Sequence, residues 1–130
     1  MPNKRVLLVE DDFMNMRLAQ HILEAEGYTV VTAATAQEAL EQIESILPDL
    51  ILMDVQLPDM DGMTVVRILR ENVVTRDITI LALTAYAMKG DRERLLQMGC
   101  NGYISKPIDV QDFINTVRRF LNPKGVNEKK

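Results

Sequence analysis

Acidic side chains follow two short apolar runs, and their positions are the clearest sign of chemistry in the chain. Residues 50–53 (Leu-Ile-Leu-Met) run without interruption into Asp54, and residues 6–9 (Val-Leu-Leu-Val) run into three consecutive carboxylates, residues 10–12. Such runs are typical of strands buried on both faces of a parallel sheet. Ligands bind at the carboxyl ends of these strands, so we expect the carboxylates to line a binding edge.

Carboxylates gathered at one edge need a counter-charge, because two unit charges about 4 Å apart repel by roughly 4 kcal/mol at an effective dielectric constant of 20. A hard divalent cation supplies it, and Mg²⁺ prefers one or two carboxylates, a carbonyl, waters and a phosphate oxygen. One carboxyl could instead keep its proton and share a hydrogen bond. A calcium loop is a weaker alternative, since residues 59–62 lack the rest of the EF-hand pattern.

Two other predicted strand ends carry groups that suit a phosphoryl ligand. Thr84 places a hydroxyl at the end of the fourth strand, and Lys106 places an ammonium at the end of the fifth. Phosphoryl transfer depends mainly on positioning and charge neutralisation, which these groups could provide beside a metal-bound carboxylate. Asp54 would then be the nucleophile that forms an aspartyl phosphate.

The elements that must position these groups alternate along the chain. Hydrophobic periodicity and turn residues predict strands at 6–9, 28–33, 50–53, 77–83 and 102–105. They predict helices at 13–26, 35–46, 63–71, 92–98 and 109–121. Five strand and helix units favour an α/β fold with a doubly wound, five-stranded parallel sheet, order 2-1-3-4-5, and helices on both faces. Strands one and three are then neighbours, so Glu10, Asp11 and Asp54 would meet.

Local signals refine three of these helices. In the first, Met14, Leu18, Ala19, Ile22 and Leu23 are expected to form one apolar stripe. The second should begin at an N-cap threonine, residue 35, with a glutamate three positions on as in a capping box. Residues 89–91 are expected to break the chain before the fourth helix.

Composition limits the class of protein. A chain of 130 residues with 47% hydrophobic residues fits one globular domain, and its net charge of -4 disfavours binding to nucleic acid or anionic membrane. The single cysteine, Cys100, cannot form an internal disulfide and is expected to be a core residue. The N-terminal apolar run is too short for a signal peptide or membrane span, so we expect a reduced, cytoplasmic protein.

Four motifs together resemble those of the receiver domain of two-component response regulators. They are Val-Glu-Asp-Asp at 9–12, Met-Asp-Val-Gln-Leu-Pro at 53–58 with Asp-Gly at 61–62, Leu-Thr-Ala at 83–85, and Tyr-Ile-Ser-Lys-Pro at 103–107. The resemblance spans residues 4–122 and leaves 123–130 as a short flexible tail. The whole chain looks most similar to stand-alone receivers of the DivK type and to receivers inside hybrid histidine kinases. It implies the flavodoxin-like, CheY-like form of the predicted fold.

The resemblance implies a role for each matching residue. Asp54 would be the phosphoacceptor for a phosphoryl group from a kinase histidine. Glu10 and Asp11 would hold Mg²⁺ with Asp54 and the backbone carbonyl of Gln56, although Glu10 replaces the commoner aspartate. Asp12 falls one position past that pair and would be a loop neighbour.

The resemblance also implies a switch and its partners. Thr84 and Tyr103 match the switch pair, Lys106 matches the phosphate-binding lysine, and the Lys106–Pro107 bond would be cis. A histidine kinase or phosphotransferase would dock near Asn15, Met16 and the loops around Asp54 and Pro107. A downstream protein would bind the face formed by residues 86–98, 103–105 and 109–121, and the chain itself would be a monomer or weak dimer.

Three rival functions deserve comparison with this signalling switch. A phosphatase that uses an aspartyl phosphate would need an acid two residues after Asp54, where Gln56 stands. A nucleotide-dependent switch would need a GxxxxGK[ST] loop, which the sequence lacks. A scaffold that is never phosphorylated stays open at this point.

Overall fold

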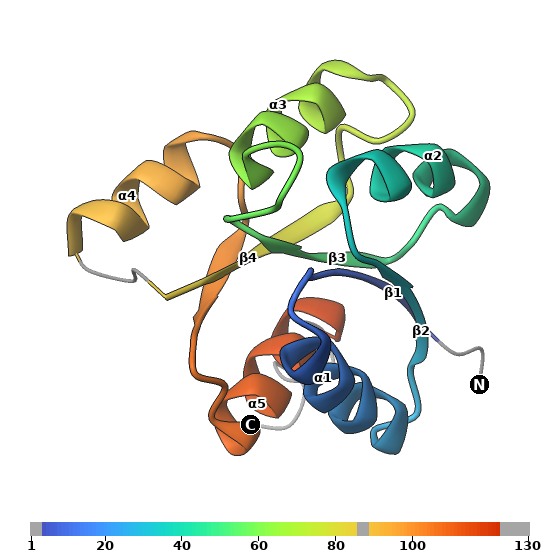
Figure 1. The fold of residues 1–130 in the computed structure, drawn as a ribbon, viewed down its shortest axis with the longest axis vertical. Coiled ribbons are helices and arrows are strands. Elements are labelled where there is room, and N and C mark those ends of the chain that lie inside the picture. The colour runs from blue at the N-terminus through green and yellow to red at the C-terminus, as the bar shows by residue number, and fades with distance from the viewer. Residues whose placement is uncertain (1–3, 86–88, 123–130) are drawn as a thin grey trace.

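The computed structural model describes residues 4–85 and 89–122, so the expected tail at 123–130 lies outside the described residues. Within this part, five strands and five helices alternate along the chain (Figure 1). The strands are β1 (Arg5–Val9), β2 (Thr29–Ala33), β3 (Leu50–Asp54), β4 (Thr79–Thr84) and β5 (Gly102–Ser105). The helices are α1 (Phe13–Ala25), α2 (Ala36–Ile46), α3 (Gly62–Glu71), α4 (Lys89–Gln97) and α5 (Val110–Leu121).

The strands form one parallel sheet in the order β2-β1-β3-β4-β5, which confirms the predicted doubly wound fold. Helices α1 and α5 cover one face of the sheet, and α2, α3 and α4 cover the other (Figure 1). In the middle of the sheet β1 pairs with β3, and Val9 lies opposite Met53. The carboxyl ends of these two strands therefore meet at the switch in strand order, where ligands bind in such sheets.

Each face of the sheet has its own apolar core. Successive side chains of a strand point to opposite faces, so Leu7 and Ile51 join the core beneath α2 and α3, whereas Leu8 and Leu52 join the core beneath α1 and α5. Phe113 is fully buried in the second core. Every residue of β3 is buried, so the strand end that carries the central aspartate is held by packing on both sides.

Side-chain caps determine where four of the helices begin. The capping residues are Asp12 for α1, Thr35 for α2, Asp61 for α3 and Asp109 for α5. Each accepts a hydrogen bond from a backbone N–H in the first turn, which satisfies a donor that has no partner within the helix. The predicted cap at Thr35 is confirmed, although Glu38 accepts from Ala34, one residue before the cap, at 2.6 Å.

Two details of the predicted helices are wrong. Helix α4 begins at Lys89 rather than at Arg92, because Gly90 near a helix start costs only about 1 kcal/mol and does not prevent the turn from forming. In α1, Met14 and Leu18 are exposed and only the other three members of the predicted stripe are buried. Successive helical residues are about 100° apart, which places Met14 and Leu18 well away from the centre of the buried arc.

The observed strand boundaries differ from the predicted ones by only one or two residues. The fourth strand begins at Thr79 instead of residue 77, and the second begins at Thr29 instead of residue 28. Cys100 is buried with a free thiol, as expected.

Candidate functional site

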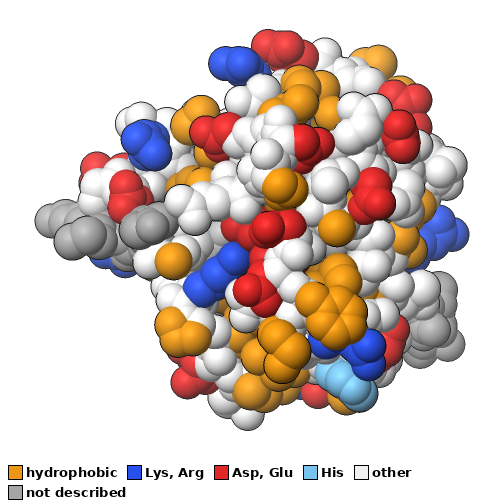
Figure 2. Space-filling model, viewed as in Figure 1, with side chains coloured by type: hydrophobic (Ala, Val, Ile, Leu, Met, Phe, Trp, Pro, Cys, Tyr) orange, Lys and Arg blue, Asp and Glu red, His pale blue; other side chains and the backbone are white. Residues whose placement is uncertain are grey.

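Three carboxylates meet where β1 and β3 end, as the predicted strand order requires. Glu10, Asp11 and Asp54 each offer an oxygen, and these oxygens all lie within 4.8 Å of one another. Glu10 is 1% exposed and Asp54 is 3% exposed, whereas Asp11 is exposed. Figure 2 shows acidic side chains, with a basic side chain beside them, near the middle of the face in view.

Lys106 contacts two of the three carboxylates directly. Its Nζ lies 2.9 Å from Glu10 Oε1 and 3.1 Å from Asp54 Oδ2. Its backbone N–H donates to the carbonyl of Thr84 at 2.8 Å, and the Lys106–Pro107 peptide bond is cis, as predicted. The sheet therefore brings the ends of β1, β3, β4 and β5 to one small site.

The crowding of charge shifts two ionisation equilibria. Burial, reinforced by a hydrogen bond shared with Asp54, raises the pKa of Glu10 from its ordinary value of 4.5 to about 7, despite the opposing effect of Lys106. Burial also opposes the charge of the Lys106 ammonium, but Glu10 and Asp54 outweigh it and raise the pKa of that lysine. Lys106 thus stays protonated at neutral pH and offsets part of the acidic charge.

The loop between β3 and α3 closes tightly over the end of β3. The Gln56 N–H donates to Asp54 Oδ1 at 3.0 Å, and Gln56 forms an isolated antiparallel bridge with Asp61. The Gly62 N–H donates to the Val55 carbonyl at 2.9 Å, and a side chain at Gly62 would collide with the backbone carbonyl of Asp54. The predicted backbone ligand, Gln56, therefore lies in a loop that is anchored beside the central aspartate.

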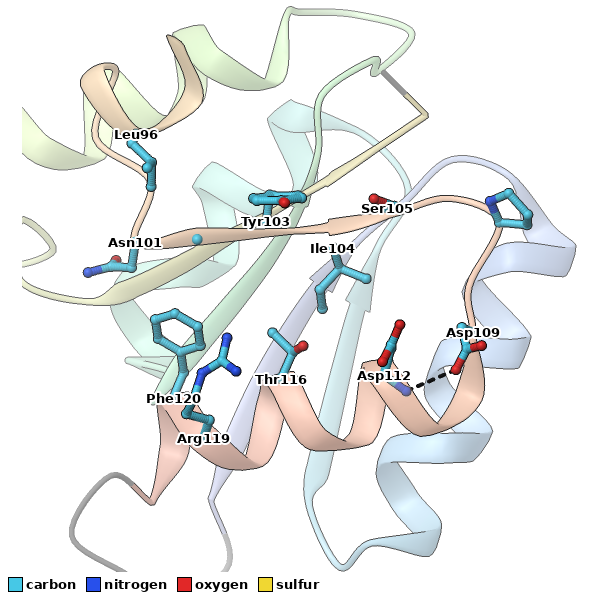
Figure 3. Close-up of a pocket in the computed structure, with 12 residues that line it drawn as sticks. Leu96, Asn101, Tyr103, Ile104, Ser105, Asp109, Asp112, Thr116, Arg119 and Phe120 are labelled. Carbon is cyan, nitrogen blue, oxygen red and sulfur yellow. Dashed lines mark hydrogen bonds between the residues drawn. The ribbon is translucent and has the colours of Figure 1, made fainter. Parts of the chain in front are cut away.

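The two predicted switch residues, Thr84 and Tyr103, lie on neighbouring strands and differ in exposure. Thr84 is buried at the end of β4, opposite Ser105 of β5. Tyr103 is half-buried, and its hydroxyl accepts a hydrogen bond from Arg92 at 3.2 Å while the guanidinium lies 5.9 Å from the ring centroid. Tyr103 lines a groove along β5 (Figure 3).

Two residues, one beside the carboxylates and one beside Tyr103, have roles that the sequence did not predict. Asp12 is the N-cap of α1, and its own N–H donates to Glu10 Oε2 at 3.1 Å. An aspartate just before an amphipathic run is a typical N-cap signal, so the sequence does contain a pattern that indicates this role. Arg92 had no such signal, because its contact with Tyr103 joins two elements that are separate in sequence.

The donor set of the pocket suits a hard cation. All of its possible ligands are oxygens, from two buried carboxylates and one exposed one, which is the chemistry that Mg²⁺ prefers. Because Asp11 is exposed, this side of the pocket is open to solvent.

Comparison with known proteins explains this arrangement. A family model described as the response regulator receiver domain matches residues 6–118. The chain belongs to the response regulator receiver domain family. This receiver domain is 46% identical over 118 residues to the polar-differentiation response regulator DivK of Brucella ovis, and the match covers 91% of this chain and 96% of that protein. The same protein of Brucella anthropi matches with the same identity and coverage.

Solved receiver domains share the fold. The receiver domain of a sensor histidine kinase from Pseudomonas aeruginosa is 36% identical, has a TM-score of 0.84 and covers 93% of this chain and 99% of its own; its active site cleft holds a coordinated magnesium ion. A chemotaxis response regulator of Vibrio cholerae is 29% identical with a TM-score of 0.87, covering 92% of this chain and 100% of its own. The predicted resemblance and fold are thus confirmed, and the chain is a response regulator of two-component signalling.

The described part of this receiver domain, residues 4–85 and 89–122, has no helix long and apolar enough to cross a bilayer.

Proposed function

We propose that Asp54 is the phosphoacceptor of this receiver domain and that Glu10, Asp11, Asp54 and the backbone carbonyl of Gln56 hold Mg²⁺. The observation that carries the proposal is the set of three carboxylate oxygens within 4.8 Å, with the Lys106 ammonium against two of them. Like charges at that spacing repel, and a cation relieves the repulsion while all three carboxylates stay ionised. Lys106 supplies one positive charge, and a bound Mg²⁺ would supply two more.

The chemistry follows from the position of Asp54. One of its carboxylate oxygens attacks the phosphorus of a phosphohistidine; a P–O bond forms, the N–P bond breaks, and its electron pair returns to the imidazole. Bound Mg²⁺ would supply neutralisation of the charge on the phosphoryl oxygens. The 3.1 Å contact with Lys106 places its ammonium where it can bind the same oxygens through a charge-assisted hydrogen bond. Phosphorylation and dephosphorylation are catalysed by the protein itself in this proposal.

Thr84 and Tyr103 would transmit the change. The Thr84 hydroxyl lies at the end of β4, next to the strand end that carries Lys106, and would move toward a phosphoryl group on Asp54. Tyr103 is held in the β5 groove by Arg92, so an inward turn of its ring would break that contact and reshape the surface. The states with the ring outward and inward would be the two populations that phosphorylation shifts.

A groove along β5 supports the expected surface for a downstream protein. It has a volume of about 520 Å³ and lies between α4 and α5, with Tyr103 on one wall and Phe120 on another (Figure 3). The groove falls within the proposed partner face of residues 86–121, of which residues 86–88 lie outside the described part. Because Tyr103 lines it, movement of that ring would alter the groove directly.

The phosphodonor would dock on the other side of the acidic pocket, near Asn15, Met16 and the loops around Asp54 and Pro107. Hydrophobic side chains gather beside the acidic group in Figure 2, and Phe13 and Met14 at the start of α1 are 60% and 74% exposed. An apolar surface next to a reacting carboxylate suits a histidine kinase or phosphotransferase. We also propose that the protein acts in the cytoplasm as a monomer or weak dimer and binds neither nucleic acid nor membrane.

The test is labelling of the purified protein by acetyl phosphate with Mg²⁺, followed by intact mass. The wild type should gain one phosphoryl group, and Asp54→Asn should gain none. Asp77→Asn, an exposed aspartate outside the site, is the matched control and should be labelled like the wild type. Equal labelling of Asp54→Asn would reject the assignment.

A second variant tests the transmission of the signal. Lys106→Ala should keep the fold and lose the difference in partner affinity between the phosphorylated and unphosphorylated protein. An unchanged ratio of the two affinities would exclude Lys106 from the switch.

A further inference from the structure

The loop from Asp54 to Gly62 is fixed at its base by its own backbone. Gln56 and Asp61 pair across it, and the Gly62 N–H donates to the carbonyl of Val55. The residues between this pair form a tip that projects from the end of β3. These bonds hold Gln56 within the loop, but they do not join the loop to the segments that follow β1 and β2.

The tip of this loop is fastened to a different element, the start of α2. Asp59 is exposed, yet both of its carboxylate oxygens are engaged: Oδ1 accepts the Ala36 N–H at 2.9 Å and Oδ2 accepts the Gln37 N–H at 3.0 Å. These hydrogen bonds lower the pKa of Asp59, with the Ala36 N–H contributing most, so the carboxylate stays charged at neutral pH. An anion at a helix N-terminus is stabilised further by the helix dipole.

Helix α2 has a cap of its own and does not need Asp59 to begin. The Thr35 hydroxyl accepts the Glu38 N–H at 3.1 Å, as a local N-cap does. Asp59 accepts hydrogen bonds from the N–H groups of Ala36 and Gln37, which lie 23 and 22 residues before it in the chain. Its bonds therefore join two loops as well as capping a helix.

The end of β2, three residues before α2 begins, is in turn bonded to the segment that carries the acidic pair. The Glu10 N–H donates to the carbonyl of Ala33, the last residue of β2, at 3.0 Å. A short path thus runs from Glu10 through a hydrogen bond to Ala33, along the backbone to Ala36, and through a second hydrogen bond to Asp59. It connects the two loops whose oxygens make up the proposed metal site.

We propose that Asp59 is a positioning residue of the magnesium site: it clamps the tip of the loop at 54–62 to α2 and so holds the Gln56 backbone in place relative to Glu10. The inference rests on the proposed function, because it assigns Gln56 to the metal. Leu57 and Met60 pack partly against the core beneath α2 and α3, so the loop stays folded without the clamp but moves more. A ligand that moves binds metal more weakly, because binding must then order it.

The experiment compares two variants that each remove a cap from the same helix. Asp59→Ala releases the loop, whereas Thr35→Ala removes the local cap and leaves the loop attached. By calorimetry, Asp59→Ala should bind Mg²⁺ about tenfold more weakly, the low end of the effects of groups that orient metal ligands. Thr35→Ala should bind Mg²⁺ like the wild type, and Asp59→Asn, which keeps one acceptor oxygen, should fall between the wild type and Asp59→Ala.

A second measurement needs no metal. Hydrogen exchange at the amides of Gln56 and Gly62 should be faster in metal-free Asp59→Ala than in metal-free Thr35→Ala. Wild-type affinity and exchange in Asp59→Ala, or an equal loss in Thr35→Ala, would overturn the positioning role. Failure of the proposed function looks different, since the wild type itself would then bind no Mg²⁺ while the exchange difference would persist.

Discussion

Replacing Glu10 by glutamine should make the metal-free protein more stable at neutral pH. Glu10 is almost fully buried, and its pKa of about 7 means that the folded protein prefers the protonated carboxyl. Glutamine has the shape of that neutral form and never ionises. The Glu10→Gln substitution therefore removes a penalty that the wild type carries once the carboxyl of the unfolded chain ionises.

The size and the pH range of this penalty follow from the two pKa values. A rise from 4.5 to about 7 on folding corresponds to about 3 kcal/mol of unfolding free energy. Below pH 4.5 the carboxyl is protonated in both states and the penalty is absent. It grows between pH 4.5 and 7, where only the unfolded chain ionises fully, and is constant above pH 7. Lys106 stays charged over this range, because its pKa is raised from 10.5.

The assay is urea unfolding of both proteins in EDTA at several pH values from 4 to 8. The stability of Glu10→Gln relative to the wild type should increase with pH by about 3 kcal/mol, mostly below pH 7. Glu71→Gln, an exposed glutamate at the end of α3, is the matched control and should show no such trend. A flat difference for Glu10→Gln, or one that falls as pH rises, would refute the reasoning.

Three further predictions concern residues outside the site. Burial raises the pKa of the Cys100 thiol from 9.0 to about 11, so at pH 8 a thiol reagent should modify the native protein at least about a hundredfold more slowly than the denatured protein in a time course. Arg70 donates to three backbone carbonyls and to Asn101, so Arg70→Ala should lower the unfolding free energy by about 2 kcal/mol in urea, with Arg70→Lys recovering less than half of that loss. The Arg118–Glu26 pair is short, at 2.6 Å, but exposed, so Arg118→Ala should change thermal stability by less than about 1 kcal/mol; a larger loss would show that the pair is not screened by solvent.

Much of the site could be predicted because its residues stand where strands end. An apolar run that stops at a carboxylate is a local pattern, and the alternation of strands and helices restricts the sheet to a few orders. From these two facts Glu10, Asp11 and Asp54 were expected together, and the structure brings them together. The N-cap of α2 was predictable because a threonine followed three residues later by a glutamate is also a local pattern.

Contacts between elements distant in sequence could not be predicted in this way. Nothing near Asp59 in the chain indicates that it caps α2, and nothing near Arg92 indicates that it holds Tyr103. The outward position of Met14 was missed because a periodic stripe does not say how wide an arc the sheet covers.

The sequence by itself determined the alternation of strands and helices, the acidic residues at the strand ends and the family to which the chain belongs, because periodicity, turn chemistry and motif spacing are properties of neighbouring residues. Only the tertiary structure decided the electrostatics of the site and the attachment of its loops. The pKa of Glu10 and the double contact of Lys106 depend on burial and on distances between atoms from different strands. Burial and these distances are defined only once the sheet has formed and the ends of its strands lie side by side.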